Sequence, residues 1–181
     1  MAINKTWVQV VTRSEASDYL IEPLGSHHDR TAFESDVESL DRYFYTSVGQ
    51  DAKKRVAAPF VLLDRTNSNV AGYYTLSATS INLGDLPTAI SLKLPKYPVV
   101  PAILLGRLAV DKNYRGKKLG EMLLMDALNR CLRSEIAAMA VVVDALDDSA
   151  RSFYEHYQFI RFPDYPNRLF LPMTTIAKIF K

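Results

Sequence analysis

Apolar and polar positions along the chain follow two periods, one typical of strands and one typical of helices. Continuous or alternating apolar runs predict strands, and apolar positions spaced about four residues apart predict helices. Strands are expected at residues 19–24, 60–63, 70–78, 102–110, 138–145, 159–162 and 169–171. Helices are expected at residues 37–55, 116–133, 148–157 and, as a turn or two, 174–180.

The order of these elements indicates the fold class. Residues 60–63 and 70–78 should form a hairpin around the polar turn 64–69, and 169–171 should pair with 159–162 across a Pro-Asn turn. The middle of the chain reads strand, turn, helix, strand, helix, strand, which implies a mixed sheet with a parallel pair around helix 116–133. We therefore expect an α/β (α+β) protein whose 181 residues form a single domain, 1–181.

One connection stands apart from this pattern. Residues 84–101 hold four of the nine prolines, Pro87, Pro95, Pro98 and Pro101. Because proline fixes φ and removes an amide donor, a stiff surface connection is expected there. A long loop inside a compact domain is often functional.

Composition narrows the class without naming a partner. Apolar residues make up 48% of the chain and charged residues 23%, which excludes a disordered protein. The net charge of +2 is too small to indicate nucleic acid by itself. The one cysteine, Cys131, lies on an apolar helix face, so a buried thiol is expected and no internal disulfide is possible. No apolar run approaches about 18 residues. We expect a soluble cytoplasmic protein that does not enter a membrane.

A basic, glycine-containing loop joins strand 102–110 to helix 116–133. It reads Tyr-Arg-Gly-Lys-Lys-Leu-Gly over residues 114–120. A strand-to-helix junction presents free backbone N–H groups at the positive end of a helix, which favours anions. Glycine lets the backbone approach a phosphate closely. Taken alone, the loop fits an ordinary basic turn equally well.

The segment GRLAVDKNYRGKKLGEMLL resembles motif A of the GNAT acetyltransferases, whose pattern is Q/R-x-x-G-x-G/A. Arg115 and Gly120 match it, and Gly116 is a common extra glycine. The resemblance implies a GNAT fold in which acetyl-CoA lies across a splay between strands 102–110 and 138–145. It assigns the pantetheine arm to the amides of Leu108, Ala109 and Val110. It assigns the pyrophosphate to Arg115, Gly116, Lys117, Lys118, Leu119 and Gly120.

A departure falls within this motif, because Lys118 occupies a position that is usually glycine. If the position needs positive φ, lysine should be strained there. If it does not, lysine adds a cation for the pyrophosphate.

Residues 144–159 resemble motif B of the same family, in which a strand end is followed by A-x-x-F-Y-x-x-x-G-F. Ala150, Phe153, Tyr154 and Phe159 match. The resemblance makes Tyr154 the general acid that protonates the departing thiolate, since a phenol with a pKa of about 10 can donate a proton. A core aromatic is the alternative. Gln158 replaces the family's glycine, so the helix ends either in a left-handed residue, at a cost of roughly 1–2 kcal/mol, or in a different turn.

More specific stretches resemble one branch of the family over roughly residues 20–171. They are LDRY at 40–43, GYYTLS at 72–77, LPKYP at 94–98 and LGRLAVD at 105–111. The branch is that of the GNAT toxins of bacterial type II toxin–antitoxin pairs. The resemblance implies acetylation of the α-amine of aminoacyl-tRNA, a ribbon-helix-helix antitoxin as partner, and a homodimer. An α-amine has a pKa near 7.7–8.0, so no strong side-chain base is required.

Two other functions remain open: acetylation of a small amine or a protein, and a non-catalytic acyl-CoA-binding or antitoxin-binding module. Among single residues, Arg107 fits a salt bridge or a contact with an acceptor phosphate equally well. Lys53, Lys54 and Arg55 end a helix, where cations are favoured without any ligand. The histidines, His27, His28 and His156, have no metal-ligand spacing, so no metal is expected.

Overall fold

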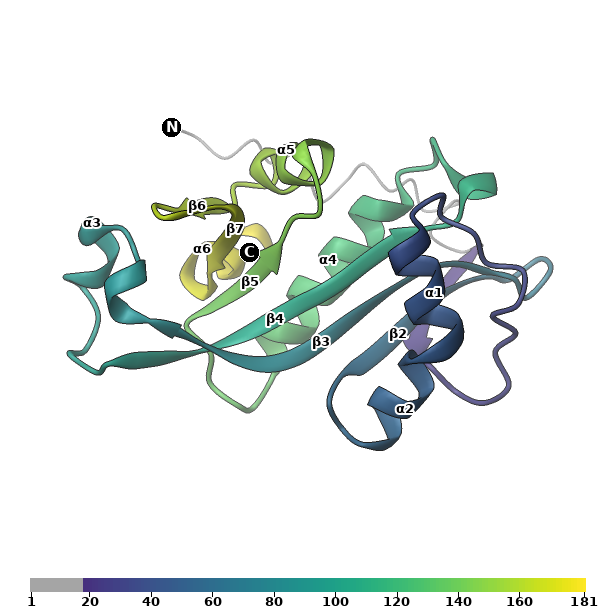
Figure 1. The fold of residues 1–181 in the computed structure, drawn as a ribbon, viewed down its shortest axis with the longest axis horizontal. Helices are drawn as coiled ribbons and strands as arrows, with labels where there is room; N and C mark the ends of the chain where they lie inside the picture. The colour runs from purple at the N-terminus through teal and green to yellow at the C-terminus, as the bar shows by residue number, and fades with distance from the viewer. Residues whose placement is uncertain (1–17) are drawn as a thin grey trace. The chain divides into compact units, whose positions relative to one another are not determined.

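The computed structural model describes residues 18–181, which form a mixed α/β structure (Figure 1). The strands are β1 Tyr19–Pro23, β2 Ala58–Asp64, β3 Val70–Asn82, β4 Val99–Val110, β5 Ala140–Asp144, β6 Ile160–Phe162 and β7 Tyr165–Pro172. The helices are α1 Glu38–Thr46, α2 Val48–Lys53, α3 Thr88–Ser91, α4 Leu119–Arg133, α5 Asp148–His156 and α6 Met173–Ile179, with 3₁₀ turns η2 Leu83–Asp85 and η3 Lys112–Tyr114. No helix among these is long and apolar enough to cross a membrane.

The strands form one seven-stranded sheet in the order β1-β2-β3-β4-β5-β7-β6. β2 and β3 pair antiparallel, as do β6 and β7, which confirms that both predicted pairs of strands form hairpins. The Pro-Asn turn predicted for the second hairpin is wrong, because Pro166 and Asn167 belong to β7 and the chain turns at Pro163 and Asp164. β4 and β5 pair in parallel from Ala102↔Ala140 to Leu105↔Val143, which confirms the parallel pair around the predicted helix. β4 continues beyond this register to Val110.

The chain divides into two compact units, each with its own core. The first unit comprises residues 18–76 and 107–127 of the described chain, together with Phe180. Aromatic residues from α1 and β3 dominate its core: Phe44 stacks on Tyr73 at 4.2 Å, and Phe33 meets both rings edge-on. Ala109 of β4 is buried in the same cluster, so the end of β4 is packed against α1 and β3.

The second unit comprises residues 77–106, 128–179 and 181. Its core lies between β4, β5 and β7 and is built mainly from small aliphatic residues and two phenylalanines. The buried members are Ile81, Leu86, Val100, Ala102, Ala140, Val142, Phe162 and Phe170. β5 is buried at four of its five positions, as its unbroken apolar run predicts.

The prediction that residues 37–55 are mainly helical is confirmed, but the helix is in two parts, because the chain forms α1 and α2 with a break at Ser47 (φ −116°). Thr46, Ser47 and Gly49 are poor helix formers, and the Thr46 hydroxyl donates to the carbonyl of Arg42 four residues earlier. Apolar spacing continues through the break because Val48 is buried with Phe44 in one core.

Two further element predictions need correction. The predicted helix 116–133 begins at Leu119, because Gly116 (φ 77°) and Lys118 (φ 57°) adopt left-handed conformations. The connection 84–101 is not devoid of regular structure, because it includes most of η2, the short helix α3 and the first residues of β4. Leu86 of this segment is buried in the core of the second unit.

Candidate functional site

The loop between β4 and α4 presents a row of backbone donors. No hydrogen bond is recorded within residues 18–181 for the backbone N–H groups of Lys117, Lys118, Leu119 and Gly120. The carbonyl of Lys118 accepts from the N–H of Met122 at 3.2 Å, so α4 starts there with its positive end toward the loop. Unpaired N–H groups at a helix start form an anion-binding site.

Glycine is required at one position of this loop. Gly116 has a φ of 77°, a conformation that side-chain-bearing residues rarely adopt, and nothing lies within 4 Å of where a Cβ would stand. The requirement therefore comes from the backbone and not from crowding. Lys118 adopts a φ of 57° without being glycine, so the lysine is in the strained conformation that the sequence left open.

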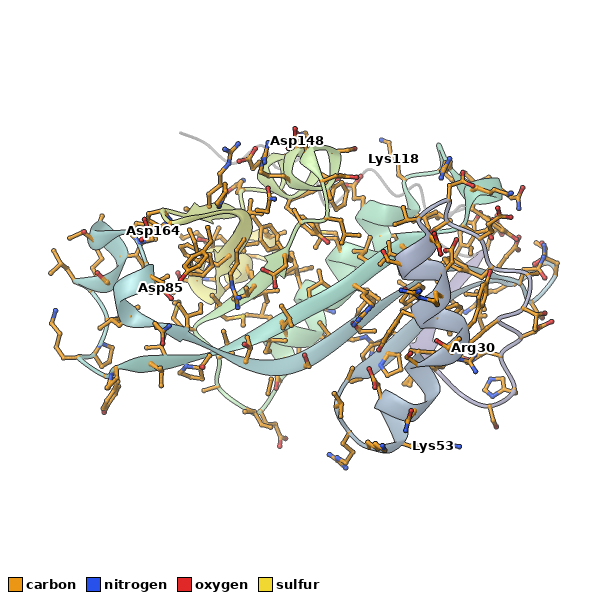
Figure 2. All side chains as sticks on the ribbon, viewed as in Figure 1. Arg30, Lys53, Asp85, Lys118, Asp148 and Asp164 are labelled. Carbon is orange, nitrogen blue, oxygen red and sulfur yellow. The ribbon has the colours of Figure 1, made fainter. Side chains whose placement is uncertain are left out.

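The three cations predicted for the loop differ in what they contact. Arg115 is engaged, because its guanidinium donates to the carbonyl of Ser35 at 2.7 Å and pairs with Asp36 at 3.0 Å. The Lys117 ammonium lies 5.2 Å from the centroid of the Tyr114 ring. Lys118 is exposed and projects away from the ribbon (Figure 2). Arg115 thus fastens the loop, whereas the two lysines lie at its surface.

A second set of contacts fixes the same loop from its other end. Asp111 accepts hydrogen bonds from the N–H groups of Glu34 at 2.9 Å and of Asn113 at 2.8 Å. Lys112 pairs with the Glu34 carboxylate at 2.6 Å. With the Arg115 contacts, the segment Glu34–Asp36 holds the loop at both ends. Sequence reasoning missed this segment, since nothing in its residue pattern indicates a partner some 80 residues away.

The end of β4 supplies the backbone assigned to the pantetheine arm. Ala109 is buried in the aromatic core, whereas Leu108 and Val110 are half-buried. Gly72 of β3 permits the close approach of the two strands, because a Cβ on it would stand 2.9 Å from the Ala109 carbonyl oxygen and 2.8 Å from Leu123. Close packing therefore requires glycine at position 72, the first residue of the stretch GYYTLS.

Tyr154 lies on α5, a helix that begins where the sequence predicts. Asp147 caps it by accepting the N–H of Ala150 at 2.7 Å, which confirms capping as the role of this carboxylate. Tyr154 is 8% exposed, and its ring packs 5.3 Å from Phe153 and from Phe159. No hydrogen bond of its hydroxyl is recorded in the described chain. Burial raises the pKa of this phenol, so the group stays protonated.

The end of α5 holds Tyr154 in place. Gln158 has a φ of 69°, so the helix ends in a left-handed residue and the alternative of a different turn is wrong. The N–H of Gln158 donates to the carbonyl of Glu155 at 2.9 Å, and the N–H of Phe159 donates to that of Tyr154 at 3.2 Å. This is the Schellman pattern, and the Tyr154–Phe159 ring contact supplies its apolar element. Two other tyrosines lie close to Tyr154 in the sequence: Tyr157 is the C-cap residue of this helix, and Tyr165 is exposed on β7.

Within residues 18–181, Arg107 forms no salt bridge, which was one of the two contacts expected for it. Its guanidinium carbon lies 3.5 Å from the centroid of the Tyr43 ring, a cation–π stack. The Tyr43 hydroxyl donates to Asp51 at 2.9 Å. Burial and the Asp51 hydrogen bond raise the pKa of Tyr43 to about 12, although the charge of Arg107 opposes this shift.

One cluster of possible metal ligands was missed by the sequence reasoning, Glu22, His27 and His28. Its hydrogen bonds explain it without an ion. Nδ1 of the buried His28 accepts the N–H of Gly25 at 2.8 Å, so the proton is on Nε2, which donates to Glu22 at 2.8 Å. Coordination through Nε2 would need the other tautomer and would break the Gly25 bond.

The first unit also contains a cavity of about 440 Å³ beside Lys117. Two of its carboxylates already have several donors. Asp64 accepts from the Thr66 hydroxyl at 2.6 Å and from the Tyr114 hydroxyl at 2.9 Å, and these hydrogen bonds lower the pKa of the carboxyl. Asp111 accepts two backbone N–H groups, as described above. The acids around this cavity organise turns.

The glycine-containing loop after β4, the parallel neighbour β5 and the helix of Tyr154 after it are the elements of an acetyltransferase of the GNAT class. Residues 101–175 match the family model described as Acetyltransferase (GNAT) domain. The chain is 37% identical over 153 residues to the tRNA-acetylating toxin of Mycobacterium tuberculosis, covering 80% of this chain and 86% of that one. It is 30% identical over 174 residues to a probable toxin TacT of Sinorhizobium fredii, covering 91% and 96%. The chain belongs to the GNAT acetyltransferases, in the group of these toxins.

Solved structures of the toxin AtaT are similar over the same extent. AtaT complexed with acetyl-methionyl-tRNAfMet has a TM-score of 0.83 and 28% identity, covering 91% of this chain and 100% of that one. A mutant AtaT bound to the C-terminus of the antitoxin AtaR and acetyl-CoA has a TM-score of 0.76 and 25% identity, covering 91% and 99%. The GNAT fold expected from the motifs is confirmed.

Proposed function

We propose that this protein transfers the acetyl group of acetyl-CoA to the α-amine of aminoacyl-tRNA and thereby blocks translation. Its similarity to a tRNA-acetylating toxin, over 80% of this chain and 86% of that one, carries this proposal. The unpaired donors before α4 and the buried phenol of α5 supply the chemical parts that such a transfer needs. Within the described residues, both sets of groups occur on the elements where the family motifs lie.

The residues present fit acetyl-CoA. The pyrophosphate would be held by the free N–H groups of the segment Arg115–Gly120, with Gly116 shaping the loop and Lys117 and Lys118 adding charge. The backbone of Leu108–Val110 would bind the pantetheine arm. Arg115 would act mainly through its backbone, because its guanidinium is bound to Asp36 and Ser35.

Tyr154 is proposed as the general acid. Acetyl-CoA supplies an activated acyl group and a sulfur leaving group. As the amine nitrogen bonds to the acetyl carbon, the carbon–sulfur bond breaks and the Tyr154 Oη–H donates its proton to the sulfur. The raised pKa keeps the hydroxyl protonated beforehand but disfavours a lasting phenolate. The proton lost by the acetylated nitrogen must therefore return to the phenol oxygen, directly or through water, and the proton count balances.

No side-chain base is assigned on the acceptor side. An α-amine with a pKa near 7.7–8.0 is partly neutral at cellular pH, so its neutral fraction can attack without a dedicated base. A lysine side chain, with a pKa of about 10.4, would need a dedicated base. This difference favours the aminoacyl ester over a protein lysine as acceptor.

The partners follow from the same relationship. An AtaT structure contains the C-terminus of an antitoxin, and we propose that this chain also binds an antitoxin, of the ribbon-helix-helix type. We further propose a homodimer that acts in the cytoplasm, where charged tRNA is found. We also propose that residues 1–181 work as one catalytic domain.

Incubation with labelled acetyl-CoA and charged total tRNA tests the function. The expected product is an N-acetyl-aminoacyl-tRNA, identified by mass spectrometry of the released adduct. Label transfer to free amines or proteins, with none on charged tRNA, would support the small-amine or protein alternative. Tight acetyl-CoA binding without any transfer would support a non-catalytic module.

A further inference from the structure

The Arg107 guanidinium is held in place by an aromatic ring while its hydrogen-bond donors remain unused. It stacks 3.5 Å above Tyr43. No hydrogen bond or ion pair of this guanidinium is recorded within residues 18–181. The nearby Asp51 carboxylate accepts the Tyr43 hydroxyl instead. Arg107 is half-buried, its guanidinium plane is fixed by the Tyr43 ring, and its N–H groups can donate two parallel hydrogen bonds to a phosphate.

The position of Arg107 on β4 separates it from the coenzyme's pyrophosphate. It lies three residues before Val110, the last residue of the strand, or about 10 Å back along the strand. The pyrophosphate already has the loop donors beyond Val110. A phosphate on Arg107 would therefore be a different one.

We propose that Arg107 binds a phosphodiester oxygen at the aminoacylated end of the tRNA acceptor strand and so positions the α-amine for transfer. This inference rests on the proposed function and assigns a residue to its substrate. Arg107 is a positioning residue, since the contact is to the acceptor backbone and not to the reacting atoms. Tyr43 orients the guanidinium, and the Asp51 hydrogen bond orients Tyr43.

Two acceptor fragments that differ by one phosphate isolate this contact. Aminoacyl-adenosine carries no phosphodiester, and cytidylyl-(3′→5′)-aminoacyl-adenosine carries one. For the wild type, the added phosphodiester should raise kcat/KM about tenfold or more, the size of a hydrogen bond between charged groups. In Arg107→Gln this gain should fall to about one, while kcat/KM on the phosphate-free fragment stays near the wild-type value. A gain retained in the variant would overturn the proposal.

Arg107→Lys keeps a charge and a long stem but lacks the planar fork, so it should keep part of the gain. If Arg107→Gln does not fold, Arg107→Lys provides the test in its place. A lysine variant that keeps the whole rise in kcat/KM would then show that the planar guanidinium is not needed. Arg133→Gln, which removes an exposed arginine at the end of α4, is the matched charge control and should keep the whole gain. On charged tRNA, the slope of log kcat/KM against log salt should decrease by about one in Arg107→Gln.

The dissociation constant of acetyl-CoA, measured by calorimetry, distinguishes the two sources of phosphate. It should be unchanged in Arg107→Gln. A tenfold weakening would place a coenzyme phosphate on Arg107 and overturn the substrate assignment. If the wild type acetylates neither fragment nor charged tRNA, the proposed function fails and this inference fails with it.

Discussion

The start of α4 and the end of α5 contain the same unusual backbone conformation on a long polar side chain. Lys118 has a φ of 57° and Gln158 a φ of 69°. Before α4, the left-handed residue leaves the following N–H groups without hydrogen-bond partners among residues 18–181. After α5, it lets two N–H groups turn back and bind the carbonyls of Tyr154 and Glu155.

The same left-handed conformation therefore has different consequences in the two regions. At α5 the cost of a left-handed glutamine, roughly 1–2 kcal/mol, is offset within the protein by the two hydrogen bonds and the ring contact of Phe159. At α4 no described protein group offsets the cost, and the donors are left for an anion. Strain that no described contact offsets therefore occurs at the helix end proposed to bind the pyrophosphate, and offset strain occurs at the helix end that fixes Tyr154.

Replacement of the phenol hydroxyl should have the largest effect. Tyr154→Phe keeps the ring that packs on Phe153 and Phe159, so folding should be nearly unaffected. Loss of a general acid costs about 10²–10⁴-fold, and the decrease should appear in kcat with an unchanged acetyl-CoA dissociation constant. If the proposed function holds, growth inhibition in cells should be lost as well.

Tyr157→Phe and Tyr165→Phe are matched controls, because each removes one tyrosine hydroxyl from the same segment and should keep near-full turnover. Near-full turnover of Tyr154→Phe would instead assign the proton to water or to one of these tyrosines. Comparison of the three variants on one substrate separates these outcomes.

Much of this fold could be predicted because its signals are local. The unbroken apolar run of β5 and the strand–loop–helix order gave the parallel pair with β4. The break at Ser47 escaped prediction because Val48 continues the apolar spacing through it. Tyr154 and the phosphate loop were visible as motifs, and their chemical roles remain predictions.

Contacts between distant segments could not be predicted from the sequence. The Asp36–Arg115 pair and the Tyr43–Arg107 stack join residues 64 or more positions apart, and neither has a local pattern. Lys118 was ambiguous for a different reason. Its residue type opposes positive φ, and only the backbone around it shows that the conformation is kept.

A side chain at Gly116 should have the next largest effect. Because Gly116 needs a φ of 77°, Gly116→Val should cost roughly 1–2 kcal/mol in that conformation or force the loop into another. The open space around the position excludes a clash as the cause. We expect about a tenfold weaker acetyl-CoA dissociation constant, measured by calorimetry, with little change in kcat at saturation. Gly84→Val, at another open glycine, should leave the affinity unchanged, and an unaltered affinity in Gly116→Val would refute the need for this loop shape.

The pH dependence should report the substrate and not Tyr154. Below the α-amine pKa of about 7.7–8.0, kcat/KM should rise about tenfold per pH unit as the neutral amine accumulates. Because burial raises the pKa of Tyr154, its protonated form persists and no fall should occur as pH increases to about 10. A descending limb near pH 8 or 9 in the wild type that is absent from Tyr154→Phe would show that the phenol titrates lower than its burial implies.

The smallest effects should come from putting glycine at the two left-handed positions, and these variants test the comparison directly. Gln158→Gly and Lys118→Gly each relieve roughly 1–2 kcal/mol of left-handed strain and lose roughly 0.4–1 kcal/mol through the more flexible unfolded chain. Each should therefore stabilise the protein by about 0.5–1 kcal/mol, a rise in Tm of roughly 1–4 °C by calorimetry.

Gln158→Gly should leave acetyl-CoA affinity unchanged, because the two hydrogen bonds at this helix end are made by the backbone. Lys118→Gly should weaken the affinity modestly, since it removes an exposed cation from the phosphate loop while the free N–H groups remain. Tenfold tighter binding in Lys118→Gly would mean that the lysine hinders the pyrophosphate. A similar change of affinity in both variants would remove the distinction between compensated and uncompensated strain.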